Sequence, residues 1–275
     1  MMTLATHFRQ RGFTLIEAIV VIVITGIIAG SISVFMIGPV KGYFDTARRA
    51  EMSDIADTAL RRMARDIQAA LPNSVRVSGS TVMEFVPMTA AGRYRSEKGV
   101  AVADDPLDFS AASDGSFDVL GPIVTLASGD SIVIFNMGQS GADVYDGTSR
   151  RAVAAPVGAV SKVTFTPGGT QFPYASPGSR FQVVSTAVTY ACDGVGNLWR
   201  YSGYAIQNPQ PTSIATLNSL ASVTKAMIAS NVTACSMIYT SGVLERNGLA
   251  YIKLAITEQG ETVTLLHQVN VVNTP

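Results

Sequence analysis

One carboxylate, Glu17, lies at the start of a long apolar stretch that carries no other charge. Arg9 and Arg11 precede it, and the apolar run extends from Ala18 to Ile37. About 20 apolar residues are enough to cross a bilayer as one helix. A carboxylate in such a span costs on the order of 3 kcal/mol at the centre and less near an end. We therefore expect Glu17 either to reach headgroup water or to bind a partner charge that arrives on assembly.

The charges that flank the apolar run predict its orientation. Arg9 and Arg11 place the N-terminus in the cytoplasm and the residues after the span in the periplasm. No A-x-A-like cleavage site follows the run, which disfavours an ordinary secretory signal. We therefore expect a single-pass inner-membrane protein with the lipid bilayer as one partner.

The residues from Gly12 to Glu17 (GFTLIE) resemble the processing motif of type IV prepilins and type II secretion pseudopilins. The resemblance implies that a membrane prepilin peptidase cuts after Gly12 and methylates the new N-terminal residue, Phe13. Gly12 suits a tight active site because it has no Cβ. The resemblance also implies that Glu17 accepts the Phe13 α-amino group of a neighbouring subunit, which would offset the cost of both charges in lipid.

A helix rich in charge is predicted after the span. Gly38 and Pro39 come first, and we expect this pair to bend or locally break the helix, either as a joint or as a stop at the membrane surface. From Tyr43 to Leu71 apolar residues recur with the 3.6-residue helical period, and Pro72 favours an end at Leu71. The apolar side should pack on a sheet. The charged side is either solvated or a contact for neighbouring subunits.

Short β-branched or alternating runs separated by turn residues follow Asn73. They predict an α+β, pilin-like fold, in which the long N-terminal helix packs on an antiparallel β-rich domain. The segment from Ser219 to Ser230 is expected to be a short helix or a turn. The expected parts are the leader (1–12), the transmembrane assembly helix (13–38), the amphipathic continuation (39–72) and the periplasmic domain (73–275).

The expected strands are Ser74–Ser78, Thr81–Pro87, Ser131–Asn136, Ala159–Thr166, Phe181–Ala191, Asn197–Ala205, Met237–Thr240, Leu249–Thr257 and Thr262–Val272.

The chain contains two cysteines, Cys192 and Cys235, and both follow the span. The periplasm is oxidising, so a disulfide is expected, with two free buried thiols as the alternative. The disulfide would close a loop of about 44 residues and raise the free energy of unfolding by roughly 4 kcal/mol.

Neither charge nor spacing favours nucleic-acid binding or catalysis. The 20 Lys and Arg balance 20 Asp and Glu, and removal of Arg9 and Arg11 leaves a slight acidic excess, whereas nucleic-acid binding needs a basic patch. Beyond the leader the only histidine is His267, with no G-x-S-x-G motif and no further zinc ligands. We expect no enzyme, cofactor or resident metal.

The acidic loop from Ala101 to Asp118 is either solvated or a weak calcium site, and its spacing does not match an EF-hand.

Two further segments, from Gly38 to Val77 and from His267 to Pro275, resemble minor pilins of the mannose-sensitive haemagglutinin (MSHA) pilus and related J-type pseudopilins and PilW-like minor pilins. The resemblance implies a minor pilin that primes assembly in a tip complex. Its partners would be the peptidase, other minor and major pilins, and the inner-membrane assembly platform. The alternatives are a J-type secretion pseudopilin and a tip adhesin whose loops, Ala101–Asp118 or Pro167–Gly178, contact a surface.

Overall fold

The computed structural model describes residues 12–241 and 247–273. The leader residues before Gly12, with Arg9 and Arg11, lie outside this part of the chain. The chain divides into two compact units, Met1–Glu51 and Met52–Pro275.

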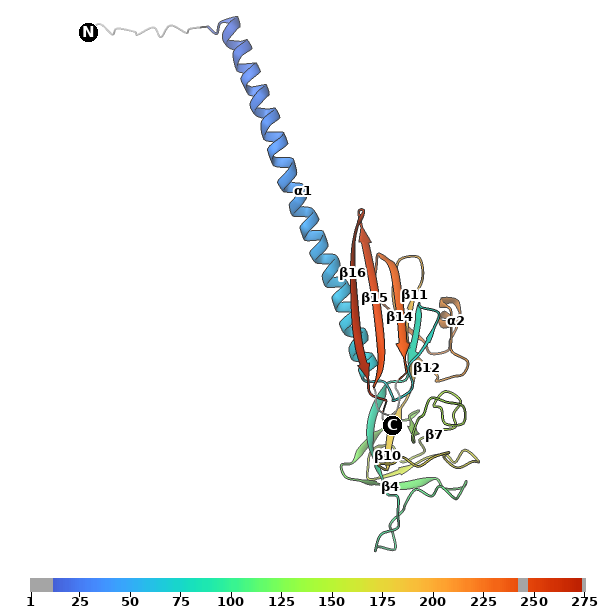
Figure 1. Ribbon diagram of the computed structural model, residues 1–275. Coiled ribbons are helices and arrows are strands. Elements are labelled where there is room, and N and C mark those ends of the chain that lie inside the picture. Colours follow the sequence, from blue (N-terminus) through green and yellow to red (C-terminus); the bar gives the residue numbers. More distant parts are fainter. Residues whose placement is uncertain (1–11, 242–246, 274–275) are drawn as a thin grey trace, which may run out of the picture. The chain divides into compact units, whose positions relative to one another are not determined.

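One helix, α1 (Leu15–Gln68), dominates the N-terminal part, and it belongs to both units (Figure 1). It continues through Gly38 and Pro39, so the expectation that this pair breaks or ends the helix is wrong. Proline lacks an N–H, which leaves only the carbonyl of Phe35 without its usual helical donor. A single lost hydrogen bond does not end a helix that is well formed on both sides. A bend at this pair stays a prediction.

The helix ends at Gln68, three residues before the predicted end at Leu71. The chain beyond it changes partner: the Leu71 N–H donates to the Val86 carbonyl at 2.7 Å, and the Met88 N–H donates to the Ala69 carbonyl at 2.9 Å. These contacts with the segment after β2 (Val82–Phe85) take the place of further helical bonds. Pairing with a segment close in space, rather than the following proline, therefore sets the helix end.

The remaining elements are β1 (Arg76–Ser78), β3 (Met88–Tyr94), β4 (Ser116–Leu120), β5 (Val124–Leu126), β6 (Ser131–Val133), β7 (Arg150–Ala152), β8 (Gly158–Val160), β9 (Lys162–Thr164), β10 (Arg180–Val184), β11 (Ala187–Cys192), β12 (Leu198–Tyr204), α2 (Ile214–Asn218), β13 (Thr224–Ala229), β14 (Val232–Thr240), β15 (Gly248–Glu258) and β16 (Glu261–Val271).

In the part of the chain that the structure describes, the strands form four antiparallel sheets. Two of them contribute to the core beneath α1: β1-β2-β11-β12-β13 and β14-β15-β16. A six-stranded sheet, β7-β6-β10-β3-β4-β9, and a two-stranded sheet, β5-β8, build the other half of the domain. The predicted α+β architecture with an antiparallel β-rich domain is thus confirmed.

The apolar side of α1 forms the core of the domain from Met52 onward. Met52, Ala56, Leu60, Met63 and Ile67 recur at three- and four-residue spacing and are at most 2% exposed. They pack against residues of both sheets beneath the helix, including Phe85 on β2 and Ile252 on β15. The predicted amphipathic pattern is therefore confirmed.

A polar contact fixes the last turn of the helix to the five-stranded sheet. The Tyr190 hydroxyl and the Arg200 Nε both donate to the same oxygen of Asp66, each at 2.8 Å. Burial and the negative charge of Asp66 raise the pKa of Tyr190. This contact complements the apolar packing because it fixes the rotation of the helix about its axis.

Several strands depart from the sequence expectation. The segment Ser219–Ser230, expected to be a short helix or a turn, begins with a turn and continues as strand β13. The run Phe181–Ala191 is divided between two strands, β10 and β11, that belong to different sheets. Strands β3, β4, β5 and β7 have no counterpart among the expected strands. In β3, the residues Ala90, Ala91 and Gly92 provide little β-propensity, and the strand depends on its neighbours β10 and β4.

We predict that Met63→Ala lowers the free energy of unfolding of the full chain in detergent by about 2–5 kcal/mol, because it leaves a cavity between helix and sheets. Thr58→Ala, at an exposed position on the same helix, is the matched control. It should change the free energy of unfolding by less than about 0.5 kcal/mol. Urea unfolding followed by the fluorescence of Trp199 measures both. Equal midpoints for the two variants would contradict the packing described here.

Candidate functional site

The processing motif leads directly into the first turn of α1. The Glu17 N–H donates to Thr14 Oγ1 at 3.3 Å, and the Ala18 N–H donates to the Thr14 carbonyl at 3.2 Å. Thr14 is therefore the N-cap, and Thr14-Leu15-Ile16-Glu17 has the sequence of a capping box. The residues to be cut and methylated, Gly12 and Phe13, precede this cap in non-helical conformation. Phe13 is 81% exposed.

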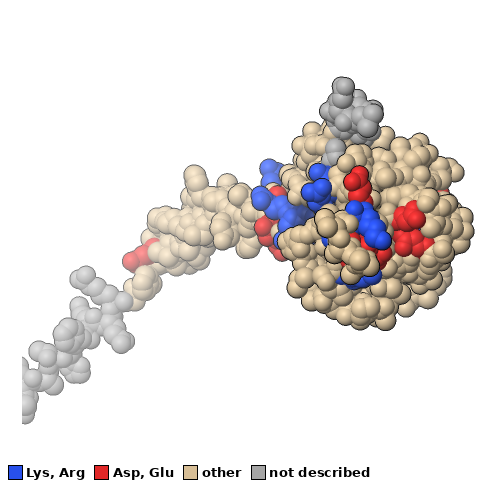
Figure 2. Space-filling view, turned by 90° about the horizontal axis from the view of Figure 1, so that it is seen from below, with Lys and Arg blue, Asp and Glu red and all other residues tan. Residues whose placement is uncertain are grey.

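Glu17 occupies a position where a negative charge is partly compensated. It lies in the first turn of α1, near the positive end of the helix dipole. No ion pair to Glu17 occurs within residues 12–241 and 247–273, and it is the sole charged residue between Gly12 and Val40. On the face drawn in Figure 2, the span is tan except for one acidic group next to the grey residues.

The span itself packs against nothing in the described chain. None of its most apolar window is buried, and α1 is the one helix in the described ranges that is long and apolar enough to cross a membrane. Its hydroxyl groups are satisfied inside the helix: Thr25 donates to the Val21 carbonyl at 2.6 Å and Ser31 to the Ile27 carbonyl at 2.8 Å. Internal satisfaction is what a lipid environment requires. These features fit a membrane-anchored, single-pass protein.

A disulfide joins the two sheets on which α1 packs. Cys192 at the end of β11 bonds to Cys235 on β14, with the sulfur atoms 2.03 Å apart. The predicted disulfide is therefore confirmed. The turn that follows is fixed by Asp193, which accepts hydrogen bonds from the Trp199 indole at 2.9 Å and the Asn197 amide at 2.8 Å. Desolvation acts to raise the pKa of Asp193, but these hydrogen bonds outweigh it and hold that pKa well below its usual range.

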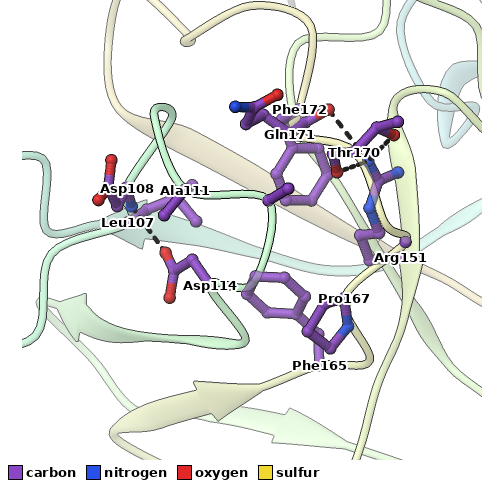
Figure 3. Close-up of a pocket in the computed structure, with 12 residues that line it drawn as sticks. Leu107, Asp108, Ala111, Asp114, Arg151, Phe165, Pro167, Thr170, Gln171 and Phe172 are labelled. Carbon is purple, nitrogen blue, oxygen red and sulfur yellow. Dashed lines mark hydrogen bonds between the residues drawn. The ribbon is translucent and has the colours of Figure 1, made fainter.

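The two loops considered for surface contact meet each other. Gln171 Nε2 donates to the Ser110 carbonyl at 2.9 Å, and together the loops line a small pocket (Figure 3). The pocket has about 10 Å³ of water-accessible space, roughly one water molecule. It is too small for a ligand such as a sugar.

The acidic loop uses its carboxylates within the protein. Asp104 and Asp118 pair with Arg95 at 3.2 and 3.1 Å, and Asp105 pairs with Lys162 at 2.8 Å. Among the described residues no three acidic, histidine or cysteine side chains are grouped so as to hold a metal ion.

Arg151 on β7 organises the second loop, and no sequence pattern pointed to it. Its guanidinium donates to the carbonyls of Thr170 at 2.8 Å and Gln171 at 3.1 Å, and it lies 4.6 Å from the centre of the Phe172 ring (Figure 3). Burial lowers the pKa of Arg151. A buried arginine bonded to main-chain carbonyls shapes the loop; its donors face the protein rather than a ligand.

Glu84 on β2 is a second buried charge that the sequence did not reveal. Its carboxylate accepts from Arg76 Nε at 2.6 Å and from the Tyr204 hydroxyl at 2.8 Å. Desolvation raises the pKa of Glu84, and the neighbouring Arg76 opposes the shift. Arg76 also stacks on Tyr145 at 3.4 Å. The polar atoms of Glu84, Arg76 and Tyr204 bond to one another, and we assign this group to the stability of the domain.

The comparison with protein families gave one match, to the prokaryotic N-terminal methylation motif, over residues 7–33. Neither the comparison with curated proteins nor that with solved structures gave a match. The match includes the exposed Gly12 and Phe13, Glu17 with its capped N–H, and the span as far as Ser33. It supports a type IV pilin-like or pseudopilin-like protein that a prepilin peptidase processes.

We predict that Cys192 and Cys235 do not react with a maleimide in the native chain and that both react after reduction. The double variant Cys192→Ser/Cys235→Ser should unfold with a free energy about 4 kcal/mol lower, because the unfolded chain is no longer constrained by the cross-link. Mass spectrometry after labelling reports the thiols, and urea unfolding reports the stability. Labelling without reduction would show that the bond is absent from the native protein.

Proposed function

We propose that the chain is a minor pilin that primes or initiates the assembly of a type IV pilus, in a complex at the pilus tip. The observation that carries this is the first turn of α1. Gly12 and Phe13 are exposed, Thr14 caps the backbone N–H of Glu17, and the most apolar window of the span that follows is unburied. Such a span needs either lipid or other helices around it. The membrane provides lipid before assembly, and the packed helices of a filament core replace the lipid afterwards.

The proposed sequence of events starts with cleavage after Gly12 on the cytoplasmic side. Methylation of Phe13 follows, and both steps are carried out by the prepilin peptidase. The new α-amino cation of one subunit then pairs with Glu17 of the next, because two opposite charges in lipid are stable only together. Arg9 and Arg11 orient the precursor with the domain in the periplasm.

The finer assignment is to the MSHA-type pilus and its minor pilin group around MshO. It rests on the likeness of the segments Gly38–Val77 and His267–Pro275 to that group. A J-type pseudopilin of a type II secretion system is the second candidate, since the methylation motif is common to both machines. Filaments isolated from cells distinguish the two, depending on whether the chain is recovered in surface pili or only in the secretion apparatus.

We also propose that the chain performs no catalysis. His267 lies on β16 opposite Ile252 of β15, with its side chain half-buried in the edge of the sheet. A tip adhesin is a further candidate: the two loops are bonded to each other around a pocket the size of a water molecule, and the second loop also lines an open hollow of about 390 Å³.

Gly12→Ala should leave an unprocessed precursor in the membrane, because the added Cβ hinders entry of the backbone into the peptidase. The intact mass of the chain, purified from cells that contain the peptidase, measures this. The matched control is Gly42→Ala, which places a methyl group in open space on the same helix and should be processed normally. A normal mature mass for Gly12→Ala would contradict cleavage at this position.

Glu17→Ala should be cleaved normally but enter filaments about tenfold less than wild type, because the Phe13 cation loses its partner in lipid. Immunoblots of sheared pili, normalised to the membrane pool, give the ratio. Glu17→Gln keeps the shape and removes the charge, and it should behave like the alanine variant. Wild-type incorporation of both variants would refute the pairing.

A further inference from the structure

Thr14 separates the helix from the peptide bond that the proposed processing breaks. The bond between Gly12 and Phe13 precedes α1, and both residues are non-helical and exposed. The main-chain bonding of the helix begins where the Ala18 N–H donates to the Thr14 carbonyl at 3.2 Å. In the described chain the carbonyls of Gly12 and Phe13 therefore take no part in helical hydrogen bonding.

The Thr14 hydroxyl ends the helix by taking the donor that an extension would need. In an α-helix the Phe13 carbonyl accepts from the N–H four residues on, which is that of Glu17. The Glu17 N–H instead donates to Thr14 Oγ1 at 3.3 Å. With that donor occupied, α1 begins at Leu15, and the Gly12 carbonyl has no helical turn to join.

Gly12 acts in the same direction as the cap. A Cβ built on Gly12 would meet nothing within 4 Å, so the packing of the chain itself does not require glycine there. Glycine is among the poorest helix formers, and it stands where an extension of α1 would have to pass. Gly12 and Thr14 thus both keep the residues on either side of the cleaved bond out of the helix.

Cleavage depends on access to the carbonyl carbon of Gly12. Hydrolysis adds the oxygen of a water molecule to that carbon, breaks its bond to the Phe13 nitrogen, and transfers a proton to the nitrogen that leaves. In an extended helix the same carbonyl would be bonded to the Ile16 N–H and enclosed by the turn. A peptide bond that is already outside the helix binds without the cost of unwinding that turn.

We propose that Thr14 is a positioning residue for processing, whose hydroxyl holds the Gly12–Phe13 bond outside α1 in the form that a peptidase binds. The inference rests on the proposed function, since it presumes that the prepilin peptidase cuts after Gly12. It adds that the helix cap of the precursor itself sets the rate of cleavage. Loss of such a cap shifts the balance between a short and an extended helix by about fivefold.

The rate of cleavage is measured on the full-length precursor in detergent, with membranes that contain the peptidase, and intact mass gives kcat/KM for conversion to the mature chain. Thr14→Val keeps the shape and the low helix propensity but lacks the hydroxyl, and it should be cut about fivefold more slowly. Thr14→Ser keeps the cap and should lie within about twofold of wild type. The matched control is Thr25→Val, because Thr25 donates to the Val21 carbonyl inside the span and takes no part in the cap. It should be cut at the wild-type rate.

The conformation of the cleavage point is measured without the peptidase. The NMR chemical shift of the Gly12 carbonyl carbon should move toward the helical range in the Thr14→Val precursor and stay unchanged in Thr14→Ser. Leu15→Pro supplies an independent end to the helix, because proline disfavours the helical conformation of the residue before it. In a Leu15→Pro background, Thr14→Val should therefore no longer slow cleavage.

Equal rates for Thr14→Val and wild type would overturn the proposal, as would slow cleavage of Thr14→Ser. An unchanged Gly12 shift in a slowly cut Thr14→Val would also overturn it. The same holds for a loss that persists in the Leu15→Pro background, because the hydroxyl would then act on the peptidase directly. A wild-type precursor that stays uncut refutes the proposed function, whereas the comparison of the Thr14 variants refutes the positioning role alone.

Discussion

The burial of one side of α1 against two sheets is the contact on which the rest of the molecule depends. From Met52 to Ile67 the helix supplies the centre of a core to which β2, β11, β15 and β16 also contribute. The bond between Cys192 and Cys235 joins the end of β11, the central strand of the five-stranded sheet, to the edge strand β14 of the three-stranded sheet, and Asp66 fixes the rotation of the helix over them. The membrane half of the same helix has no such partners in the described part of the chain. One secondary-structure element therefore holds the domain together and also leaves a surface that only lipid or other helices can cover.

Glu17 lies at the start of the unburied part of α1, and this position determines how its charge can be stabilised. Within the chain it is a first-turn residue: Thr14 Oγ1 accepts its backbone N–H, and the positive end of the helix dipole reduces the cost of its carboxylate. Neither of these supplies a cation. In the assembly we propose, the Phe13 amine of a neighbouring subunit supplies it, and that amine exists only after cleavage. On this proposal, processing at Gly12 is coupled to the stability of the assembled spans.

The sequence predicted those features that depend on local pattern. The helix periodicity identified the buried residues of α1, and the two cysteines outside the span identified the disulfide. Features that depend on distant partners were missed. Strand β3 contains alanines and a glycine and forms because β10 lies beside it, and the run Phe181–Ala191 divides at Ser185 and Thr186, where no glycine or proline signals a break. The buried groups around Arg151 and Glu84 combine segments up to 120 residues apart, so no spacing rule could reveal them.

The N-terminus of the mature chain tests the central claim most directly. The wild-type protein, purified from membranes of cells that contain the prepilin peptidase, is digested and its N-terminal peptide sequenced by tandem mass spectrometry. The account predicts a chain that begins at Phe13 and carries one methyl group on its α-amino nitrogen. A chain that retains residues 1–12, or that begins beyond the span, would contradict it.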